Sequence, residues 1–135
     1  MDRTIAVLTD VKDVSDLLDG ASLDQVGVKP AGGNVQLVLG LTRAMLEQQA
    51  VVRRGFTRRI KTPWTKCELQ LSRVKSLTIR RASDRAPDQA PLLACDAVVG
   101  GYQLTVKAPD GLELILGMDQ LDGRFADVGR PIDSP

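Results

Sequence analysis

The sequence predicts a mainly β protein: a small antiparallel β-sandwich or open β-barrel of about six to eight strands with one or two short helices. Three observations support this fold class. Apolar and polar residues alternate over several short stretches, turn-forming residues separate these stretches, and the apolar residues are mostly Leu and Val rather than aromatic. Branched aliphatic side chains suit the pleated surface of a sheet. No long helical pattern alternates with the strands, which argues against an α/β fold.

The alternation predicts five strand segments. Each contains two or more apolar residues spaced two apart, as expected where one face of a strand is buried. The segments are VQLVLGLTR at 35–43, ELQLSRV at 68–74, KSLTIRR at 75–81, YQLTVKA at 102–108 and LELIL at 112–116.

Two turn motifs predict hairpins. Residues 108–111 read Ala-Pro-Asp-Gly, which favours a type I turn with a bulge at Gly111 between strands 101–107 and 112–117. Residues 29–34, with a proline and two glycines, should join SLDQVGV to VQLVLGL in the same way.

The other segments carry weaker patterns. VKDVSDLLDG has helical spacing and a final glycine as a stop, whereas RAMLEQQAVV allows either a short helix or the continuation of the strand before it. A third hairpin is expected between 67–80 and the weaker strand 92–99. Residues 118–135, rich in glycine and proline, predict an irregular C-terminal tail.

The bulk composition predicts one globular domain over residues 1–135. No apolar run reaches the ~18 residues that span a bilayer, and MDRTIAVLTD does not resemble a secretory signal. We therefore expect a cytoplasmic protein that does not bind membranes, of bacterial type by its composition. Cys67 and Cys95 form no C-x-x-C pair and are expected to be structural.

The chain contains no histidine, which removes Ser-His-Asp and Cys-His catalysis and the common zinc ligand sets. We expect no cofactor, no metal and no enzymatic activity. An enzyme would have to use carboxylates alone, with Asp119 and Asp122 as the candidate cluster. Asp119, Asp122 and Asp127 also allow a Ca²⁺ or Mg²⁺ site, but turn capping or pairing with basic residues is the favoured interpretation.

Charge is unevenly distributed along the chain. Residues 1–50 carry a net charge of −3, residues 51–81 carry +9, and residues 82–135 carry −5. This segregation has two explanations: a basic face for an external partner, or middle strands that lie beside acidic neighbours in the sheet.

The basic segment peaks at VVRRGFTRRIKTPWTK, residues 51–66, which holds six basic and no acidic residues. Arginine and lysine can contact phosphates, and interleaved aromatic residues can stack on bases. Alternatively, the two aromatic side chains fill the core and the basic residues coat a loop. The candidate ligand-binding residues are Arg53, Arg54, Arg58, Arg59, Lys61, Phe56 and Trp64.

The run Arg53-Arg54-Gly55-Phe56-Thr57-Arg58 has the form R-R-x-x-x-R and resembles the arginine motif of PilZ domains, small β-barrels that bind cyclic di-GMP. The second PilZ motif, D/N-x-S-x-x-G, is approximated by residues 96–101, where Val98 replaces the serine. The resemblance implies that the arginines bind phosphates and guanine edges.

These observations favour a non-catalytic binding or interaction module whose working surface is residues 53–66. A protein partner or self-association is the leading expectation. The alternative is an anionic ligand, either nucleic acid or a cyclic dinucleotide bound as in PilZ domains, held by the same arginines.

Overall fold

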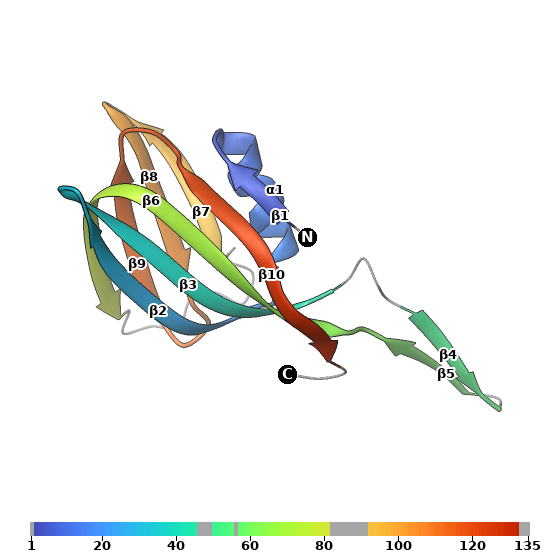
Figure 1. Ribbon diagram of the computed structural model, residues 1–135. Helices are drawn as coiled ribbons and strands as arrows, with labels where there is room; N and C mark the ends of the chain where they lie inside the picture. The colour runs from blue at the N-terminus through green and yellow to red at the C-terminus, as the bar shows by residue number, and fades with distance from the viewer. Residues whose placement is uncertain (1, 46–49, 56, 82–91, 133–135) are drawn as a thin grey trace.

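A computed structural model describes residues 2–45, 50–55, 57–81 and 92–132 of the chain. These residues form ten strands and one helix, and eight of the strands build a single curled antiparallel sheet, a half-barrel (Figure 1). The mainly β fold predicted from the sequence is therefore confirmed. The elements are β1 (Asp2–Ile5), α1 (Leu8–Leu17), β2 (Ser22–Ala31), β3 (Asn34–Ala44), β4 (Ala50–Arg54), β5 (Thr57–Lys61), β6 (Trp64–Arg81), β7 (Leu93–Val98), β8 (Gly101–Lys107), β9 (Leu112–Met118) and β10 (Gly123–Ile132).

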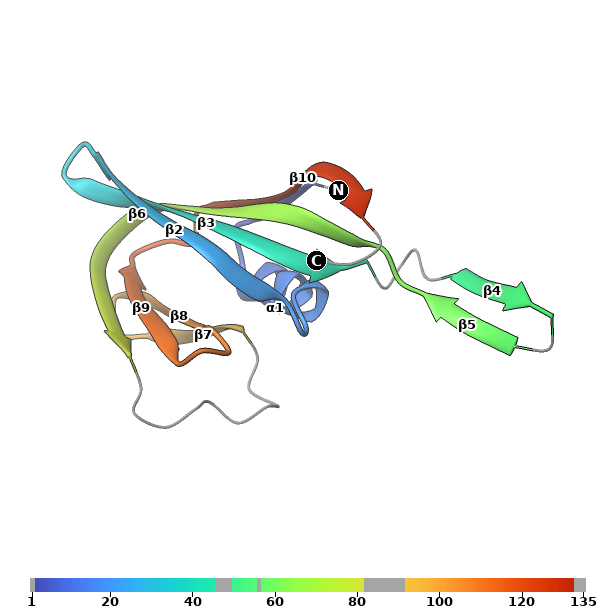
Figure 2. The same ribbon diagram turned by 90° about the horizontal axis from the view of Figure 1, so that it is seen from below.

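The long strand β6 organises the half-barrel. Its first half pairs with β3 on one edge and with β10 on the other, whereas its second half pairs with β9. Between the halves, Arg73 has a φ of 58°, and the register against β9 shifts between Val74 and Ser76. Such irregularities bend a strand. As a result β7, β8 and β9 fold beneath the layer formed by β1, β10, β6, β3 and β2 (Figure 2).

The core lies between these two layers. Alternate residues of β3, β6, β8 and β9 point inward, which explains the period-two pattern of the sequence. Helix α1 contacts both β7 and β1 and buries Val11 and Val14 in the same core. The Asp10 carboxylate accepts hydrogen bonds from the N–H groups of Ala6 (2.9 Å) and Val7 (3.1 Å) at the start of the helix. Further members of the core include Leu37, Leu39, Leu41, Leu69, Leu71, Leu104, Leu114, Leu116 and Phe125.

Both hairpins predicted from turn motifs are present. The Gly111 N–H donates to the Ala108 carbonyl (3.1 Å), and Gly111 has a φ of 96°, so β8 and β9 are joined as expected. The turn between β2 and β3 is tighter than expected. It consists of Gly32 and Gly33 alone, with φ values of 55° and 85°, because a type I′ turn needs two residues that tolerate positive φ.

The predicted third hairpin is wrong. Residues 67–80 lie in β6 and pair with β3, β9 and β10, whereas β7 pairs with β8. The short connection through Gly100, at a φ of 86°, closes β7 onto β8 directly. A tight turn of this kind costs less chain entropy than pairing segments that are separated by more residues.

The prediction of an irregular tail over 118–135 is also wrong for its central part. Strand β10 lies between β1 and β6, with Phe125 buried on its inner face. The inner residues before and after Phe125 are Gly123 and Asp127. The sequence of this strand therefore shows no alternation of apolar and polar residues. Gly123 is needed because an added Cβ would lie 3.0 Å from both the Gln70 carbonyl oxygen and the Leu71 side chain.

The helix predicted within VKDVSDLLDG is confirmed as α1, although it begins three residues earlier, at Leu8. The start of RAMLEQQAVV continues β3 as far as Ala44, and its end belongs to β4. Residues 46–49 lie outside the described residues. No helix in the described part of the chain has the length and hydropathy to cross a membrane.

Candidate functional site

The sequence-predicted site residues fall mostly on one hairpin. Arg53 and Arg54 end β4, and β5 carries the basic residues at 58, 59 and 61. The two strands pair with each other in a separate two-stranded sheet, which extends away from the half-barrel (Figures 1 and 2). Phe56 lies outside the described residues. We call residues 50–61 the arginine hairpin.

The register of the arginine hairpin places like charges opposite each other. Arg53 is the direct Cα partner of Arg58, and Arg54 is the partner of Thr57. Gly55, with a φ of 61°, lies in the connecting turn. Like charges directly across an antiparallel pair are destabilising. Because residues 50–61 contain no acidic residue, the hairpin concentrates positive charge.

The base of the hairpin is held by backbone contacts. The Met45 N–H donates to the Pro63 carbonyl (2.7 Å), which links the chain entering the hairpin to the chain leaving it. Beyond this contact, Ala44 pairs with Trp64 and Arg43 pairs with Thr65 in the β3–β6 ladder. The last described residue before the hairpin, Met45, and the residues just after it, Pro63 and Trp64, therefore belong to the end of the β3–β6 ladder.

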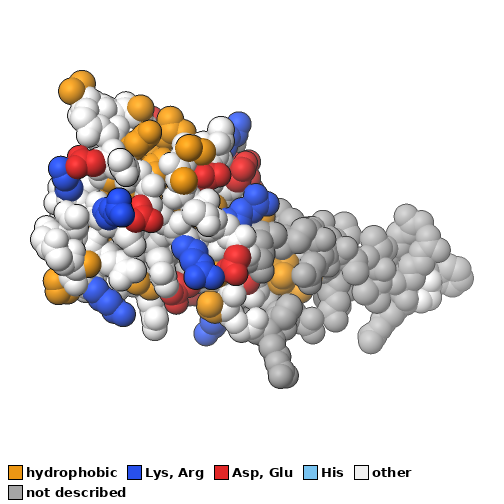
Figure 3. Space-filling view, turned by 45° about the horizontal axis from the view of Figure 1, so that its top comes forward, with side chains coloured by type: hydrophobic (Ala, Val, Ile, Leu, Met, Phe, Trp, Pro, Cys, Tyr) orange, Lys and Arg blue, Asp and Glu red, His pale blue; other side chains and the backbone are white. Residues whose placement is uncertain are grey.

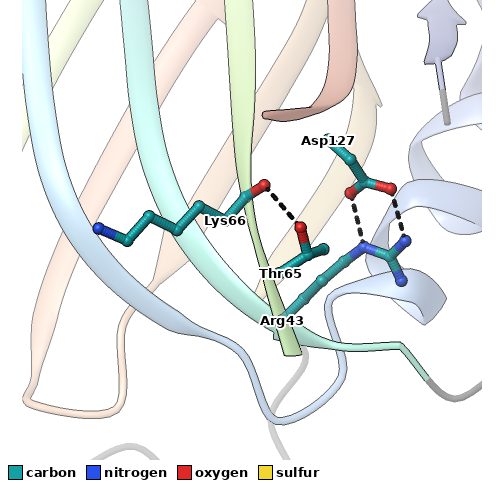
Figure 4. A network of polar contacts seen from close by, with 4 residues as sticks. All are labelled: Arg43, Thr65, Lys66 and Asp127. Carbon is teal, nitrogen blue, oxygen red and sulfur yellow. Dashed lines mark hydrogen bonds and ion pairs between the residues drawn. The ribbon is translucent and has the colours of Figure 1, made fainter. Parts of the chain in front are cut away.

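Just inside this base is a buried ion pair (Figure 4). The Arg43 side chain is fully buried, and its Nε and Nη2 donate to the two carboxylate oxygens of Asp127, at 3.0 and 2.9 Å. The guanidinium also lies 5.9 Å from the ring centre of Phe125, within range of a cation–π contact. The neighbouring Thr65 hydroxyl donates to the Lys66 carbonyl (3.3 Å). A bidentate pair fixes both side chains in one orientation.

Cys67 lies beside the same ion pair, opposite Leu41 on β3 and Asp127 on β10. Burial, and secondarily the negative charge of Asp127, raise the pKa of the Cys67 thiol to about 12. A protonated thiol is a poor nucleophile, so Cys67 serves the packing of the core. Burial also raises the pKa of Cys95. Both cysteines are free thiols.

Four basic residues of β6, all beyond Ser72, lie beside acidic residues of β9 and its flanking turns. The shortest of these ion pairs joins Lys75 to Asp119 at 2.5 Å. On the face seen in Figure 3, basic and acidic side chains are interspersed over the half-barrel. The other pairs are Arg73–Asp122 (3.2 Å), Arg80–Glu113 (3.0 Å) and Arg81–Asp110 (3.5 Å).

The three aspartates singled out from the sequence therefore pair with basic residues of β3 and β6, as the favoured interpretation predicted. On this surface the hydrogen bond from Arg80 lowers the pKa of the Glu113 carboxyl. The explanation of the charge segregation by acidic neighbours is correct for β6. The strands of the arginine hairpin pair with each other and with no other strand of the described residues.

Trp64 is half-buried at the start of β6. Its immediate neighbour Thr65 is buried and belongs to the inner set of β6, so Trp64 lies on the outer face, between Ala44 and Ile132. The alternative in which Trp64 fills the core is therefore wrong. Its register partner Ala44 directly precedes Met45, at the base of the arginine hairpin.

The two PilZ-like motifs do not come together. The arginine motif is on the arginine hairpin, whereas Asp96 on β7 and Gly101 on β8 flank a turn at the opposite end of the molecule (Figures 1 and 2). A single dinucleotide would need both motifs within a few ångströms of one another.

A second feature was missed by the sequence reasoning because it depends on packing. A shallow groove of about 330 Å³ lies between α1 and β7, with an apolar floor that includes Val11 and Leu93. Lys12 and Asp16 lie on its helical side, and Cys95 lines its strand side. The amphipathic pattern of the helix was visible in the sequence, but its position against an edge strand was not.

Comparison of the chain with models of known protein families, with curated proteins and with solved structures finds no match, so its function is inferred from its own residues.

Proposed function

We propose that this protein is a non-catalytic binding module whose arginine hairpin contacts the phosphate backbone of a nucleic acid. The observation that carries the proposal is the register of β4 and β5, in which Arg53 is opposite Arg58 in a segment without acidic residues. Repulsion between these arginines costs folding free energy. Phosphate groups lying along the hairpin remove that repulsion and release condensed counterions on binding.

The ion pairs within the half-barrel also support a nucleic acid as the partner. Among the described residues, three aspartates are engaged within the half-barrel, where Asp119 and Asp122 pair with β6 and Asp127 pairs with Arg43. Five of the ten basic residues in segment 51–81 lie on the hairpin. The hairpin is therefore the natural place for an external anion.

The geometry of a two-stranded ribbon also suits a nucleic acid. The major groove of duplex DNA admits such a ribbon, and single strands can lie along a basic one. Trp64, half-buried at the hairpin base, offers an indole face for stacking on an unpaired base. The buried Arg43–Asp127 pair and the Met45–Pro63 hydrogen bond support a fixed direction of the hairpin from the half-barrel. The cytoplasmic location expected from the sequence is part of this proposal.

The test is fluorescence polarisation with labelled duplex DNA, single-stranded DNA and RNA over a range of salt concentrations. We expect binding at low salt, with a slope of log K against log salt of roughly −3 to −5 if most of the hairpin cations contact phosphates. The variant Arg53→Glu/Arg58→Glu should weaken binding at least about 100-fold and flatten the slope.

The matched control is Lys12→Glu/Lys107→Glu, which makes the same change in net charge on exposed residues of the half-barrel. It should retain most of the affinity. The proposal fails if no nucleic acid binds at low salt, or if both variants lose affinity equally. Calorimetric titration with cyclic di-GMP separates the dinucleotide alternative, because heat with that ligand and none with polynucleotides would replace the proposed partner.

A further inference from the structure

Strand β2 is a long free edge of the half-barrel. Nine of its ten residues pair with β3, the exception being Asp24 at a register shift, and no other described strand lies along its outer side. Val26 and Val28 have Leu39 and Leu37 as register partners. They therefore lie on the inner face of the sheet, yet they are 37% and 47% exposed. An edge with unpaired backbone groups and exposed apolar side chains is a template for another strand.

The hairpin geometry indicates which backbone groups of β2 point outward. In a two-residue type I′ hairpin, the residues on either side of the turn form backbone hydrogen bonds to each other. From there, every second residue of a strand forms backbone hydrogen bonds to the other strand, and the residues between them point their N–H and C=O groups away from it. Ala31 and Asn34 close this turn. Counting back, Lys29 and Gly27 bond toward β3, so Val26, Val28 and Pro30 direct their backbone groups outward. Proline, which lacks an N–H, is tolerated at such an outward position.

We propose that the protein forms a two-fold symmetric dimer in which β2 pairs antiparallel with β2 of a second copy, centred on Gly27. In this register Val26 lies opposite the partner's Val28, and both valines have outward N–H and C=O groups. The arrangement occurs twice by symmetry. Each exposed valine of the strand then covers another, and the interface is self-complementary, as a closed two-fold contact requires.

Charge along the strand is complementary in the same register. Lys29 falls opposite the partner's Gln25 and next to the partner's Asp24. The Asp24 carboxylate is held on the outer face by the hydroxyl groups of Ser22 (2.9 Å) and Thr42 (2.5 Å). Lys29 lies on the same outer face. Its register partner Gln36 precedes the inward-facing Leu37 on β3 and therefore points outward. A second copy therefore brings opposite charges together at both ends of the contact.

Disulfide trapping at the centre of symmetry tests the register. Gly27 would face the partner's Gly27 as a non-hydrogen-bonded pair, in which Cα atoms lie about 4.5 Å apart, within the range for a disulfide. An added Cβ at Gly27 meets nothing closer than 3.6 Å within the same chain. We expect Gly27→Cys, in a Cys95→Ala background, to form a covalent dimer under mild oxidation.

The matched control is Lys29→Cys in the same background, because two such residues would be about 13 Å apart in this register. It should stay largely monomeric on a non-reducing gel. Equal cross-linking of the two variants, or none with Gly27→Cys, would overturn the proposal.

Sedimentation of the unmodified protein provides a second measurement. We expect a reversible dimer whose dissociation constant rises at least about tenfold in Val28→Lys, which removes both valine pairs. The control Val99→Lys alters a fully exposed valine in the β7–β8 turn and should leave the dimer unchanged. A protein that remains monomeric at high concentration, or that loses the dimer equally with both substitutions, would refute the contact.

Discussion

Arg43 illustrates how a single residue connects the half-barrel to its projecting hairpin. It continues the inner-facing series of leucines on β3, but its side chain is charged and fully buried, with Asp127 as a bidentate partner. A buried ion pair contributes little net stability compared with apolar residues of the same size, because both charges have lost water. Its value is orientation, since the pair lies where β3, β6 and β10 meet below the arginine hairpin.

We predict that Arg43→Met lowers the free energy of unfolding by about 3–5 kcal/mol, because the Asp127 carboxylate, only 11% exposed, loses its bidentate cationic partner. Urea denaturation followed by circular dichroism measures this loss. The control is Arg124→Met, which removes an exposed arginine 3.5 Å from Asp2 and should cost less than about 1 kcal/mol. Similar losses for the two variants would mean that the Arg43–Asp127 pair has no special structural role.

Strand β10 shows that neighbouring strands can determine a strand whose own sequence has only a weak alternation of apolar residues. Its inner residues are a glycine, an aromatic residue and a carboxylate, so its sequence gives no period of apolar residues. Its place comes from β1 and β6 on either side, with Gly123 allowing β6 to approach closely. Strand β2 is a different case, because the turn motif that follows it predicted the hairpin although most residues of the strand are exposed.

We predict that Gly123→Ala destabilises the protein by about 1–3 kcal/mol, because the new methyl group would crowd the Gln70 carbonyl and the Leu71 side chain, each 3.0 Å away. The midpoint of guanidinium unfolding measures the effect. Gly40→Ala on β3 is the control. Its Cβ would lie 3.4 Å from the Gln25 Cβ, an ordinary contact, so it should be close to neutral. A neutral Gly123→Ala would contradict the close packing of β10 on β6.

At the scale of the whole molecule, charge is divided between two parts. Several basic residues of the half-barrel pair with acidic ones, while the arginine hairpin carries five basic residues and no acidic one in its sequence. The proposed dimer would carry two arginine hairpins on one particle. Two linked sites raise the effective concentration of the second contact, so a long nucleic acid would be bound more tightly than a short one.

We predict that adding sodium chloride lowers the thermal unfolding midpoint of the half-barrel slightly, by a few degrees at most, because salt screens its exposed ion pairs. Differential scanning calorimetry between low and moderate salt measures this change. The direction should reverse for the double variant Asp119→Asn/Asp122→Asn, in which the remaining basic residues repel each other until salt screens them. An unchanged or higher midpoint of the parent protein would mean that the pairs do not contribute.

Part of the candidate site could be predicted from sequence alone. The basic and aromatic composition of 51–66 was visible, and so was its contrast with the acidic segments on either side. The sequence did not show that the basic segment 51–81 is divided between the arginine hairpin and the ion pairs of β6. Ion pairs such as Lys75–Asp119 join residues far apart in the chain. For the same reason the outer position of Trp64 and the separation of the PilZ-like motifs depended on strand order, which no local pattern reports.

The sequence by itself determined the β class, the helix α1, and the hairpins β2–β3 and β8–β9, because each depends on side-chain period and on glycines within a few residues. Only the tertiary structure decided that β6 bends to serve two layers, that β10 completes the sheet, and that the arginine hairpin stands apart from it. These features depend on pairing between distant segments, whose free energy comes from burial and from opposite charges that meet only after folding.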